Sequence, residues 1–353
     1  MKGRPSIGHR LLRNPGTLFG LIVIGAATLI AVTGYLIAPD GSPDANRIIV
    51  EIGGRKPGFR QEFLLVKKPG ALERSGFFHR LLFGQPDEYD HIPIGGYLTS
   101  GDSVIVQKFV DDGVYERRSY LRTGPPRVEM RRSWLGTDKY GRDILSRLLI
   151  GVRVSLAVGM VTVLLSISVG VLLGALAGYF RGRVDEIILW LVNVIWSIPT
   201  LLLVFAIMLV LGKGFWQVFV AIGLTLWVNV ARIVRGQVLA VREREYVEAA
   251  RALGYSHTRI LFRHILPNIM GPVWVVAASN FASAIVIEAG LSFLGVGVQP
   301  PQPSWGLMIK ENYNFIITHN PMLALAPGIA IMLLVLAFNL LGNGLRDVLN
   351  VRV

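Results

Sequence analysis

The sequence predicts an all-α polytopic membrane protein of six transmembrane helices, with a small β-rich domain inserted between the first two. Of its 353 residues, 52% are hydrophobic and only 17% are charged, whereas a soluble domain is typically about 25% charged. Most of the apolar residues lie in long runs, and a long stretch of soluble composition separates the first two runs. This composition excludes a disordered chain and argues against an ordinary soluble enzyme.

Six apolar stretches are long enough to cross about 30 Å of hydrocarbon as helices. They are residues 17–38, 154–179, 187–211, 216–240, 269–291 and 323–345. Basic residues precede the first stretch, as they would in a signal peptide. Its run of about 22 apolar residues exceeds the roughly 7–15 of a signal peptide, and no small-residue cleavage site follows it. We therefore expect an uncleaved first helix after a cytoplasmic tail of residues 1–16.

The distribution of basic residues predicts the orientation. With the N-terminus inside, cytoplasmic segments carry 15 basic side chains, whereas the two short outside loops carry only Lys213 and Lys310. The 15 are Lys2, Arg4, Arg10, Arg13, Arg181, Arg183, Arg232, Arg235, Arg242, Arg244, Arg251, Arg259, Arg263, Arg346 and Arg352. Because cytoplasmic loops of membrane proteins are rich in Lys and Arg, both termini are expected in the cytoplasm. This bias also explains the net charge of +13, so nucleic acid is not an expected partner.

Residues 39–133 are expected to form a small extracytoplasmic domain. The outside segment 39–153 has about 115 residues, too many for a structureless loop in a compact protein. The predicted elements are strands over Arg47–Glu51, Phe59–Lys68, Val104–Val110 and Val114–Leu121 and a short helix within Gly70–Phe83. The last two strands form a predicted hairpin, in which Gly113 supplies the positive φ of the turn. The alternative is that these residues form an extended arm lying on the outer face of the membrane that the chain spans.

The chain lacks the motifs of an enzyme. It has no cysteine, and no GxxxxGK[ST] phosphate loop, GxSxG elbow or HExxH zinc pair occurs. Its six histidines show no metal-ligand spacing; His257 and His264 are seven residues apart. We therefore expect no catalytic residue, metal or cofactor on this chain. Energy for active transport must then come from an ion gradient or from a partner.

Glu288 is the one clear ionisable residue identified within a predicted span. Because a charge in hydrocarbon is costly and usually functional, Glu288 is a candidate residue of a transport pathway. No basic partner accompanies it, which weakens the case for a proton relay. A hydrogen bond across a helix interface near the outer end is the competing interpretation.

Residues 241–268 form the most informative segment of the chain, VREREYVEAARALGYSHTRILFRHILPN. Residues Tyr246–Leu253 favour a helix that Gly254 ends in a left-handed cap, and Ser256 is suited to cap a second helix. Three alanines, at positions 249, 250 and 252, leave a face of little bulk that would let the helix press against a partner. Pro267 marks the start of the next span. The residues alone leave two readings open, docking to a partner and contact with lipid headgroups.

The same segment resembles the EAA loop of ABC importer permeases, EAA–x3–G–x9–I–x–LP. His264 stands where the pattern has isoleucine, and Ile265 follows; the His-Ile-Leu-Pro-Asn ending is similar to the peptide permeases. In that family the loop forms a coupling helix that sits in a cleft of a separate cytoplasmic ATPase. The residues to which the resemblance assigns this coupling role are Glu248, Ala249, Ala250, Arg251, Gly254, Leu266 and Pro267.

Two further segments resemble the C-type permease subunit of dipeptide and oligopeptide ABC importers. One is Leu135–Arg147, before the second span, and the other is Leu291–Pro301 with the following Pro-Ser-Trp-Gly, after the fifth span. Their motif residues, expected at the outer face, are Gly136, Asp138, Gly141, Arg142, Asp143, Gly295, Gly297, Pro300, Trp305 and Gly306.

These motif residues also have a physical reading. Gly136 and Gly141 permit turns, and Arg142 and Asp143 are able to pair or to cap the helix that enters the membrane. The glycines and prolines after the fifth span predict an irregular outer loop, with Trp305 as an interfacial anchor.

The resemblance implies the type I ABC importer permease fold, with a permease core over residues 134–353. The implied function is that of the membrane-spanning subunit of an ATP-driven importer in the bacterial inner membrane, translocating di- or oligopeptides. Nickel, glutathione, opines and oligosaccharides are alternative substrates on the same scaffold, and a non-transport sensor or assembly factor is a distant alternative. The implied partners are a solute-binding protein, a paralogous permease forming a heterodimer, and two ATPase subunits that hold ATP and Mg²⁺; a homodimer is the second possibility.

Overall fold

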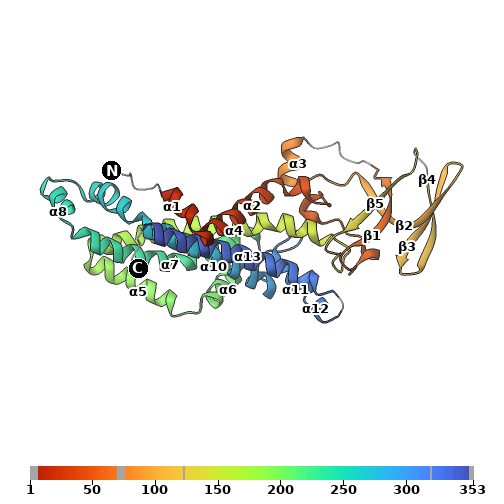
Figure 1. Cartoon of the computed structure of the whole chain (residues 1–353). Helices are drawn as coiled ribbons and strands as arrows, with labels where there is room; N and C mark the ends of the chain where they lie inside the picture. Colours follow the sequence, from red (N-terminus) through yellow and green to blue (C-terminus); the bar gives the residue numbers. More distant parts are fainter. Residues whose placement is uncertain (1–6, 70–75, 122–123, 319, 350–353) are drawn as a thin grey trace. The chain divides into compact units, whose positions relative to one another are not determined.

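The computed structural model describes residues 7–69, 76–121, 124–318 and 320–349 (Figure 1). The chain divides into two compact units. The first comprises Met1–Ala27, Ser155–Gln299 and Ile331–Val353, and the second comprises Thr28–Val154 and Pro300–Ala330. Residues 70–75, the first part of the predicted short helix, lie outside the described residues, as do residues 1–6 of the predicted tail.

Long apolar helices dominate the first unit. Its helices, including those shared with the second unit, are α1 (Ile7–Arg13), α2 (Pro15–Ile37), α4 (Ile144–Phe180), α5 (Gly182–Trp196), α6 (Thr200–Leu211), α7 (Phe215–Arg242), α8 (Glu245–Ala252), α9 (His257–Arg259), the π-helical η3 (Ile260–Ile265), α10 (Leu266–Leu294) and α13 (Met322–Leu349). A helix satisfies its backbone hydrogen bonds internally, which is why apolar runs adopt it in hydrocarbon. Within the described residues, five helices are long and apolar enough to cross a membrane.

The predicted span 187–211 differs from the other five. It is two helices, α5 and α6, bent by 95° at a short break. Pro199 explains the break, because proline lacks a backbone N–H and disfavours the α conformation at the residue before it. The pair counts either as one broken span or as a re-entrant loop, which gives five or six crossings.

A stripe of glycines lets α4 pack closely on α7. Gly170, Gly174 and Gly178 recur every four residues, and a Cβ atom at each would lie 2.5, 2.4 and 2.8 Å from α7 atoms. In a bilayer the hydrophobic effect does not drive helices together, so they associate through close backbone packing of this kind. Asp185 at the start of α5 adds a bidentate pair with Arg235 of α7, at 2.5 and 2.6 Å.

The second unit contains a five-stranded antiparallel sheet in the order β4-β3-β2-β1-β5 (Figure 1). The strands are β1 (Phe59–Lys67), β2 (Tyr89–Ser100), β3 (Ser103–Asp111), β4 (Val114–Leu121) and β5 (Arg127–Ser133). The strand predicted over Phe59–Lys68 and the predicted hairpin are confirmed, and Gly113 has φ +77° in the turn. The strand predicted over Arg47–Glu51 is wrong, because this stretch is irregular and leads into the 3-10 turn η2 (Val50–Ile52). Strands β2 and β5 were not predicted from the sequence.

The sheet packs apolar side chains on both faces. Leu64, Ile94, Val104 and Val106 form a cluster on one face, and Phe63 and Phe109 pack with Ile49 and Ile52 on the other. The remaining helical elements of this unit are η1 (Pro43–Ala45), α3 (Phe77–Phe83), α11 (Trp305–Asn312) and α12 (Phe315–Thr318). The predicted insertion 39–133 is therefore part of a larger unit that also includes residues 300–330 and the adjacent helix ends.

Candidate functional site

Helix α8, within the EAA-like segment, has one buried face and one exposed face. Val247 and Ala250 are 0% and 4% exposed, and they pack with Tyr179 and Val238 in the core of the first unit. The opposite face exposes Glu248, Ala249, Arg251, Ala252 and Leu253. The expectation that all three alanines share the free face is thus wrong for Ala250, because the helical period places it beside Val247. On this exposed surface Ala249 and Ala252 form a low-bulk area, with the acidic residues Glu245 and Glu248 and the basic residue Arg251 around it.

The end of α8 is tightly defined. Gly254 has φ +76°, and the backbone N–H of Tyr255 donates to the carbonyl of Ala250 at 3.1 Å. The predicted left-handed cap is therefore confirmed, and so is the cap of the next helix, where the Ser256 hydroxyl accepts from the Arg259 N–H. Nothing lies within 4 Å of a Cβ atom built on Gly254, so only the backbone conformation requires glycine there.

The segment is held to α4 through Tyr179. The Tyr179 hydroxyl lies 2.9 Å from Nδ1 of His257, and the guanidinium of Arg242 bonds to the Tyr179 carbonyl. His257, Thr258 and Arg259 lead into the π-helical turn η3, whose Ile260, Leu261 and Ile265 are buried. These contacts hold α8 against the ends of the spanning helices and leave its other face exposed.

The last residues of the EAA-like segment lie at the start of α10. Leu266 is half-buried and Pro267 is exposed. Pro267 lies in the first turn of α10, as predicted, but the helix is continuous with the π turn before it. The ring of His264, at the position where the EAA pattern has isoleucine, stacks on Tyr255 at 5.8 Å, while Ile265 is fully buried.

A polar cavity of about 340 Å³ lies among α5, α7, α10 and α13 of the first unit. Its polar and aromatic lining consists of Trp196, Asn229, Arg232, Ser279, Asn280 and Arg346. The guanidinium of Arg232 lies 3.6 Å from the centre of the Trp196 ring, and the Trp196 Nε1–H donates to Asn229 at 3.2 Å. Among the described residues, no acidic side chain lines the cavity. The lining therefore favours an anionic group or a hydrogen-bond acceptor.

Arg232 was given no site role from the sequence. It is counted from the sequence with the cytoplasmic residues, yet it lies inside the predicted span 216–240. In the structure α7 continues beyond it to Arg242, about 15 Å further along the helix axis. The signal was available, because an arginine within a span is a functional candidate by default.

Glu288 is buried in α10, with 1% of its surface exposed. Its carboxylate accepts a hydrogen bond of 2.6 Å from Ser292 one turn later, and the Ser292 oxygen in turn accepts from the Val298 N–H at 3.0 Å. Glu288 therefore has a hydrogen-bond partner within α10. A hydrogen bond across a helix interface stays a prediction.

The first permease-like motif, within Leu135–Arg147, forms a buried charge cluster in the second unit. Asp138 accepts from the Arg142 Nε–H at 2.6 Å, and Arg142 Nη2 lies 2.7 Å from Glu311 of α11. Arg147, fully buried, lies 3.4 Å from Glu311 and 3.7 Å from Asp138. Two acids thus balance two guanidinium groups. Glu311 was not predicted, because it follows the second motif in an ordinary helix.

The turns of the first motif follow the prediction. Gly136 and Gly141 have φ +84° and +74°, and a Cβ atom on Gly141 would lie 1.7 Å from the Ile49 carbonyl oxygen. Asp143 caps α4, accepting from the Ser146 N–H and hydroxyl at 2.8 and 2.6 Å. Burial raises the pKa of the Asp143 carboxyl, and the two hydrogen bonds from Ser146 oppose this shift.

The second motif is corrected at Trp305. Gly295 has φ +85° and ends α10, Gly297 packs against Ser292, and Pro300 is exposed. Trp305 is not an interfacial anchor: it is 3% exposed, and its Nε1–H donates to the Leu148 carbonyl at 3.1 Å. The physical reason is Gly151, whose missing side chain leaves the slot that the indole fills, since a Cβ there would lie 2.9 Å from the ring. Gly306 is buried beside it.

Electrostatics in the sheet domain centre on Arg47. Its guanidinium forms a pair with Asp87, and Arg47 also lies 3.2 Å from Asp40. Burial raises the pKa of the Asp87 carboxyl, but the hydrogen bond and charge of Arg47, together with the charges of His91 and Lys68, lower it below its ordinary value. Burial, together with the charges of Arg47 and Arg131, lowers the pKa of His91 to about 3.

Comparisons with known proteins agree with this architecture. Residues 170–353 match the family described as binding-protein-dependent transport system inner membrane component. The chain is 44% identical over 217 residues to the glutathione transport system permease protein GsiD of Pectobacterium atrosepticum, a match covering 62% of this chain and 72% of that protein. It is 41% identical over 217 residues to the oligopeptide transport system permease protein OppC of Bacillus subtilis, covering 62% and 71%.

A solved structure of the MetNI methionine ABC transporter in an inward-facing conformation also matches, at 20% identity and a TM-score of 0.48, covering 57% of this chain and 95% of that one. The family match, which spans more than half of the chain, and the identity to curated relatives together establish the relationship. The chain belongs to the family of binding-protein-dependent transport system inner membrane components and is a permease component with several apolar helices.

Proposed function

We propose that this permease imports di- or oligopeptides, delivered by a solute-binding protein, into the cytoplasm. The names of its relatives support this substrate class, since they specify oligopeptide, dipeptide and glutathione transport, and glutathione is itself a tripeptide. The sensor or assembly-factor alternative has no observation in its favour.

In this proposal, a separate ATPase subunit hydrolyses ATP and this chain forms part of the membrane pathway. The exposed, low-bulk face of α8, at Glu248, Ala249 and Ala252, is the observation that carries this coupling role. Ordered contacts through Tyr179 tie the helix to α4, so a push on α8 would be transmitted to a spanning helix. ATP and Mg²⁺ belong to the ATPase subunits, and this chain binds no cofactor of its own.

The decisive experiment blocks the exposed face without disturbing the fold. An Ala249→Trp variant places an indole on that surface, where nothing in the chain's own core contacts it. We expect normal insertion and assembly but no stimulation of ATPase activity by binding protein loaded with a tripeptide. Ala26→Trp, at an exposed position of α2, is the matched control and should behave as wild type. Full stimulation in the Ala249→Trp variant would refute docking at this face.

The complete importer contains, in this proposal, a second and paralogous permease and two ATPase subunits. One coupling segment per chain supplies half of an assembly with two ATPase sites, which is the reason for the pairing. A homodimer is the alternative. Purification of an active complex with this chain as its sole type of membrane subunit would replace the heterodimer by the homodimer.

The proposed topology places both termini and residues 241–268 in the cytoplasm and the sheet domain outside. The positive-inside bias supports this orientation. The sheet domain, predicted from the sequence over 39–133, would then be positioned to contact the solute-binding protein. A domain tethered at the outer mouth has a high effective concentration for anything docked there.

The polar cavity at Arg232 is proposed to line the inner part of the transport pathway. Arginine binds carboxylates with strong, charge-assisted hydrogen bonds, and every unblocked peptide has a terminal carboxylate. Arg232 and Arg346 both border the cavity, so it would attract this group electrostatically. Glu288, buried in α10 and bonded to Ser292, remains a proposed pathway residue whose role is less direct than that of the cavity.

A further inference from the structure

Helix α3 of the sheet domain exposes nearly all of its apolar side chains. Its sequence is FFHRLLF, and none of its residues is buried. Phe77, Phe78, Leu82 and Phe83 are 63%, 76%, 51% and 59% exposed. Four large apolar side chains on one short helix are an exposed patch of the kind that marks a contact with a membrane or a protein.

The C-terminal end of α3 is fixed to the ends of two spanning helices. The Leu82 carbonyl accepts from the Arg153 guanidinium of α4 at 2.8 Å, and the Gln85 N–H donates to the carbonyl of Gly41, just beyond α2, at 2.8 Å. Gly84 lies so close to Tyr35 of α2 that a Cβ atom there would be 3.0 Å from the ring. Figure 1 shows α3 beside this end of α2.

These attachments define the depth of α3. Arg153 directly precedes the apolar run 154–179, and Tyr35 lies near the end of the run 17–38. The Arg153 guanidinium lies 5.0 Å from the centre of the Tyr35 ring. Arginine and tyrosine at the ends of apolar runs mark the boundary between hydrocarbon and headgroups. Helix α3 is therefore level with that boundary.

The lipid-facing surface of α2 leads directly to α3. Val32, Leu36 and Ile37, in the last turns of α2, are 52%, 38% and 53% exposed, as expected for side chains that face acyl chains. Close by, α3 presents its phenylalanines together with the exposed basic residues His79 and Arg80, and its seven residues include no acid. Aromatic side chains with basic neighbours suit the interface between acyl chains and phosphate headgroups.

We propose that α3 is a membrane-surface anchor, with its phenylalanines inserted into the leaflet on the side of the sheet domain. The anchor holds the sheet domain at the bilayer surface, beside the ends of α2 and α4. A phospholipid bilayer is the occupant that both the depth and the charge favour; a partner protein would leave the phenylalanines shielded but away from lipid.

The absence of cysteine from the sequence makes a direct test simple. In the full chain, reconstituted in vesicles of phosphatidylcholine and phosphatidylglycerol, a Phe78→Cys variant is labelled with an environment-sensitive fluorophore. Leu98→Cys, 71% exposed on β2, is the aqueous control, and Leu29→Cys, 64% exposed in the middle of α2, is the hydrocarbon control. Each label is then quenched by aqueous iodide or by a lipid with a nitroxide high on its acyl chain.

We expect the label at position 78 to be quenched by the nitroxide lipid and protected from iodide, with the opposite result at position 98. Iodide quenching at position 78 equal to that at position 98 would overturn the anchor. Protection from both quenchers, in the isolated chain or in the assembled transporter, would also overturn it and would indicate a protein contact. Because α3 buries none of its side chains, the cysteine variant should fold as wild type does.

Discussion

The side chains of Arg142 and Glu311, 169 positions apart in the chain, form an ion pair with 2.7 Å between Nη2 and Oε2. Arg142 belongs to the motif before α4, and Glu311 to the helix that follows the second motif. Trp305 reinforces this connection, because its indole N–H donates to Leu148. The motif before α4 and the helix α11 are thus joined within the second unit.

Replacing Glu311 by Gln should destabilise the protein strongly. The change leaves Arg142 and Arg147 buried with Asp138 as their remaining acid, and removing one member of a buried ion pair typically costs about 3 kcal/mol or more. Thermal unfolding in detergent measures the effect. Glu116→Gln is the matched control, because its pair with Arg118 is half exposed and should contribute little. Equal midpoints for the two variants would contradict this account.

Replacing Gly254 by Val should uncouple the transporter and leave it assembled. Valine is unfavourable at φ +76°, by about 1–2 kcal/mol, so the end of α8 would rearrange. We expect insertion and complex formation at normal levels but loss of ATPase stimulation by loaded binding protein. Gly212→Val is a close control, since Gly212 also has a positive φ of +83° and open surroundings. Normal stimulation by the Gly254 variant would reject the coupling role.

The sheet domain should be removable without loss of the permease core. Phe59 and Ser133 are opposed in the β1–β5 ladder, so deletion of Arg60–Arg132 is closed by a short Gly/Ser linker. Retaining Phe59 keeps part of the cover over Ile49 and Ile52. We expect intact membrane insertion and basal ATPase activity, with weaker binding of the solute-binding protein or slower transport. Transport at the full rate with unchanged affinity would make the domain a passive feature.

The stability of the sheet domain should fall as the pH drops from about 6.5 toward 3 because of His91. In this window an unfolded chain protonates the imidazole while the folded chain does not, so protons favour unfolding. The contribution is complete above the ordinary pKa of 6.5 and is lost as the pH falls to about 3. His91→Phe should flatten the dependence of the thermal midpoint between pH 7 and about 5. His79→Gln, on the exposed helix α3, should leave it unchanged, and a slope identical in all three proteins would exclude His91 as the cause.

Replacing Arg232 by Gln should slow transport without uncoupling the ATPase. The change removes a positive charge from the polar cavity and the cation–π contact with Trp196. Charge-assisted hydrogen bonds typically contribute about 1.5–3 kcal/mol, so peptide uptake should fall by roughly tenfold or more. Uptake of a labelled tripeptide into proteoliposomes is the measurement, with Arg183→Gln as the exposed control. Unchanged uptake would remove the cavity from the pathway.

Short-range sequence patterns determine much of the secondary structure of this protein. Long apolar runs specify helices, because in hydrocarbon the backbone must satisfy its hydrogen bonds internally. Gly254 and Gly113 specify a cap and a turn through their backbone conformation, and Ser256 specifies a cap through its hydroxyl. The EAA-like segment was recognisable for the same reason, since its residues act over short spacings. Each of these features depends on neighbours within a few residues.

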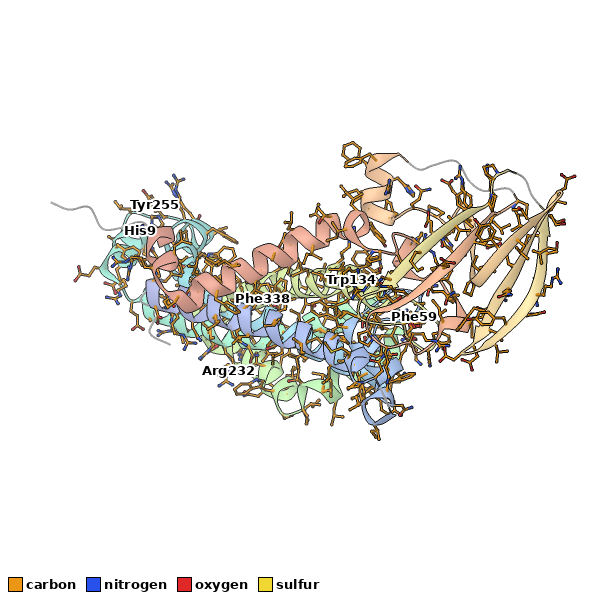
Figure 2. All side chains as sticks on the ribbon, turned by 45° about the vertical axis from the view of Figure 1, so that its right-hand side comes forward. His9, Phe59, Trp134, Arg232, Tyr255 and Phe338 are labelled. Carbon is orange, nitrogen blue, oxygen red and sulfur yellow. The ribbon has the colours of Figure 1, made fainter. Side chains whose placement is uncertain are left out.

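Tertiary packing decided the rest. Whether Trp305 meets lipid or fills the slot at Gly151 depends on a residue more than 150 positions away. Figure 2 draws the side chains as sticks on the ribbon. The pairing of Arg142 with Glu311 and the exposure of the phenylalanines of α3 likewise depend on which distant segments meet. No periodicity or cap encodes such contacts, because their energies come from burial and charge pairing that arise only after the helices and strands have packed together.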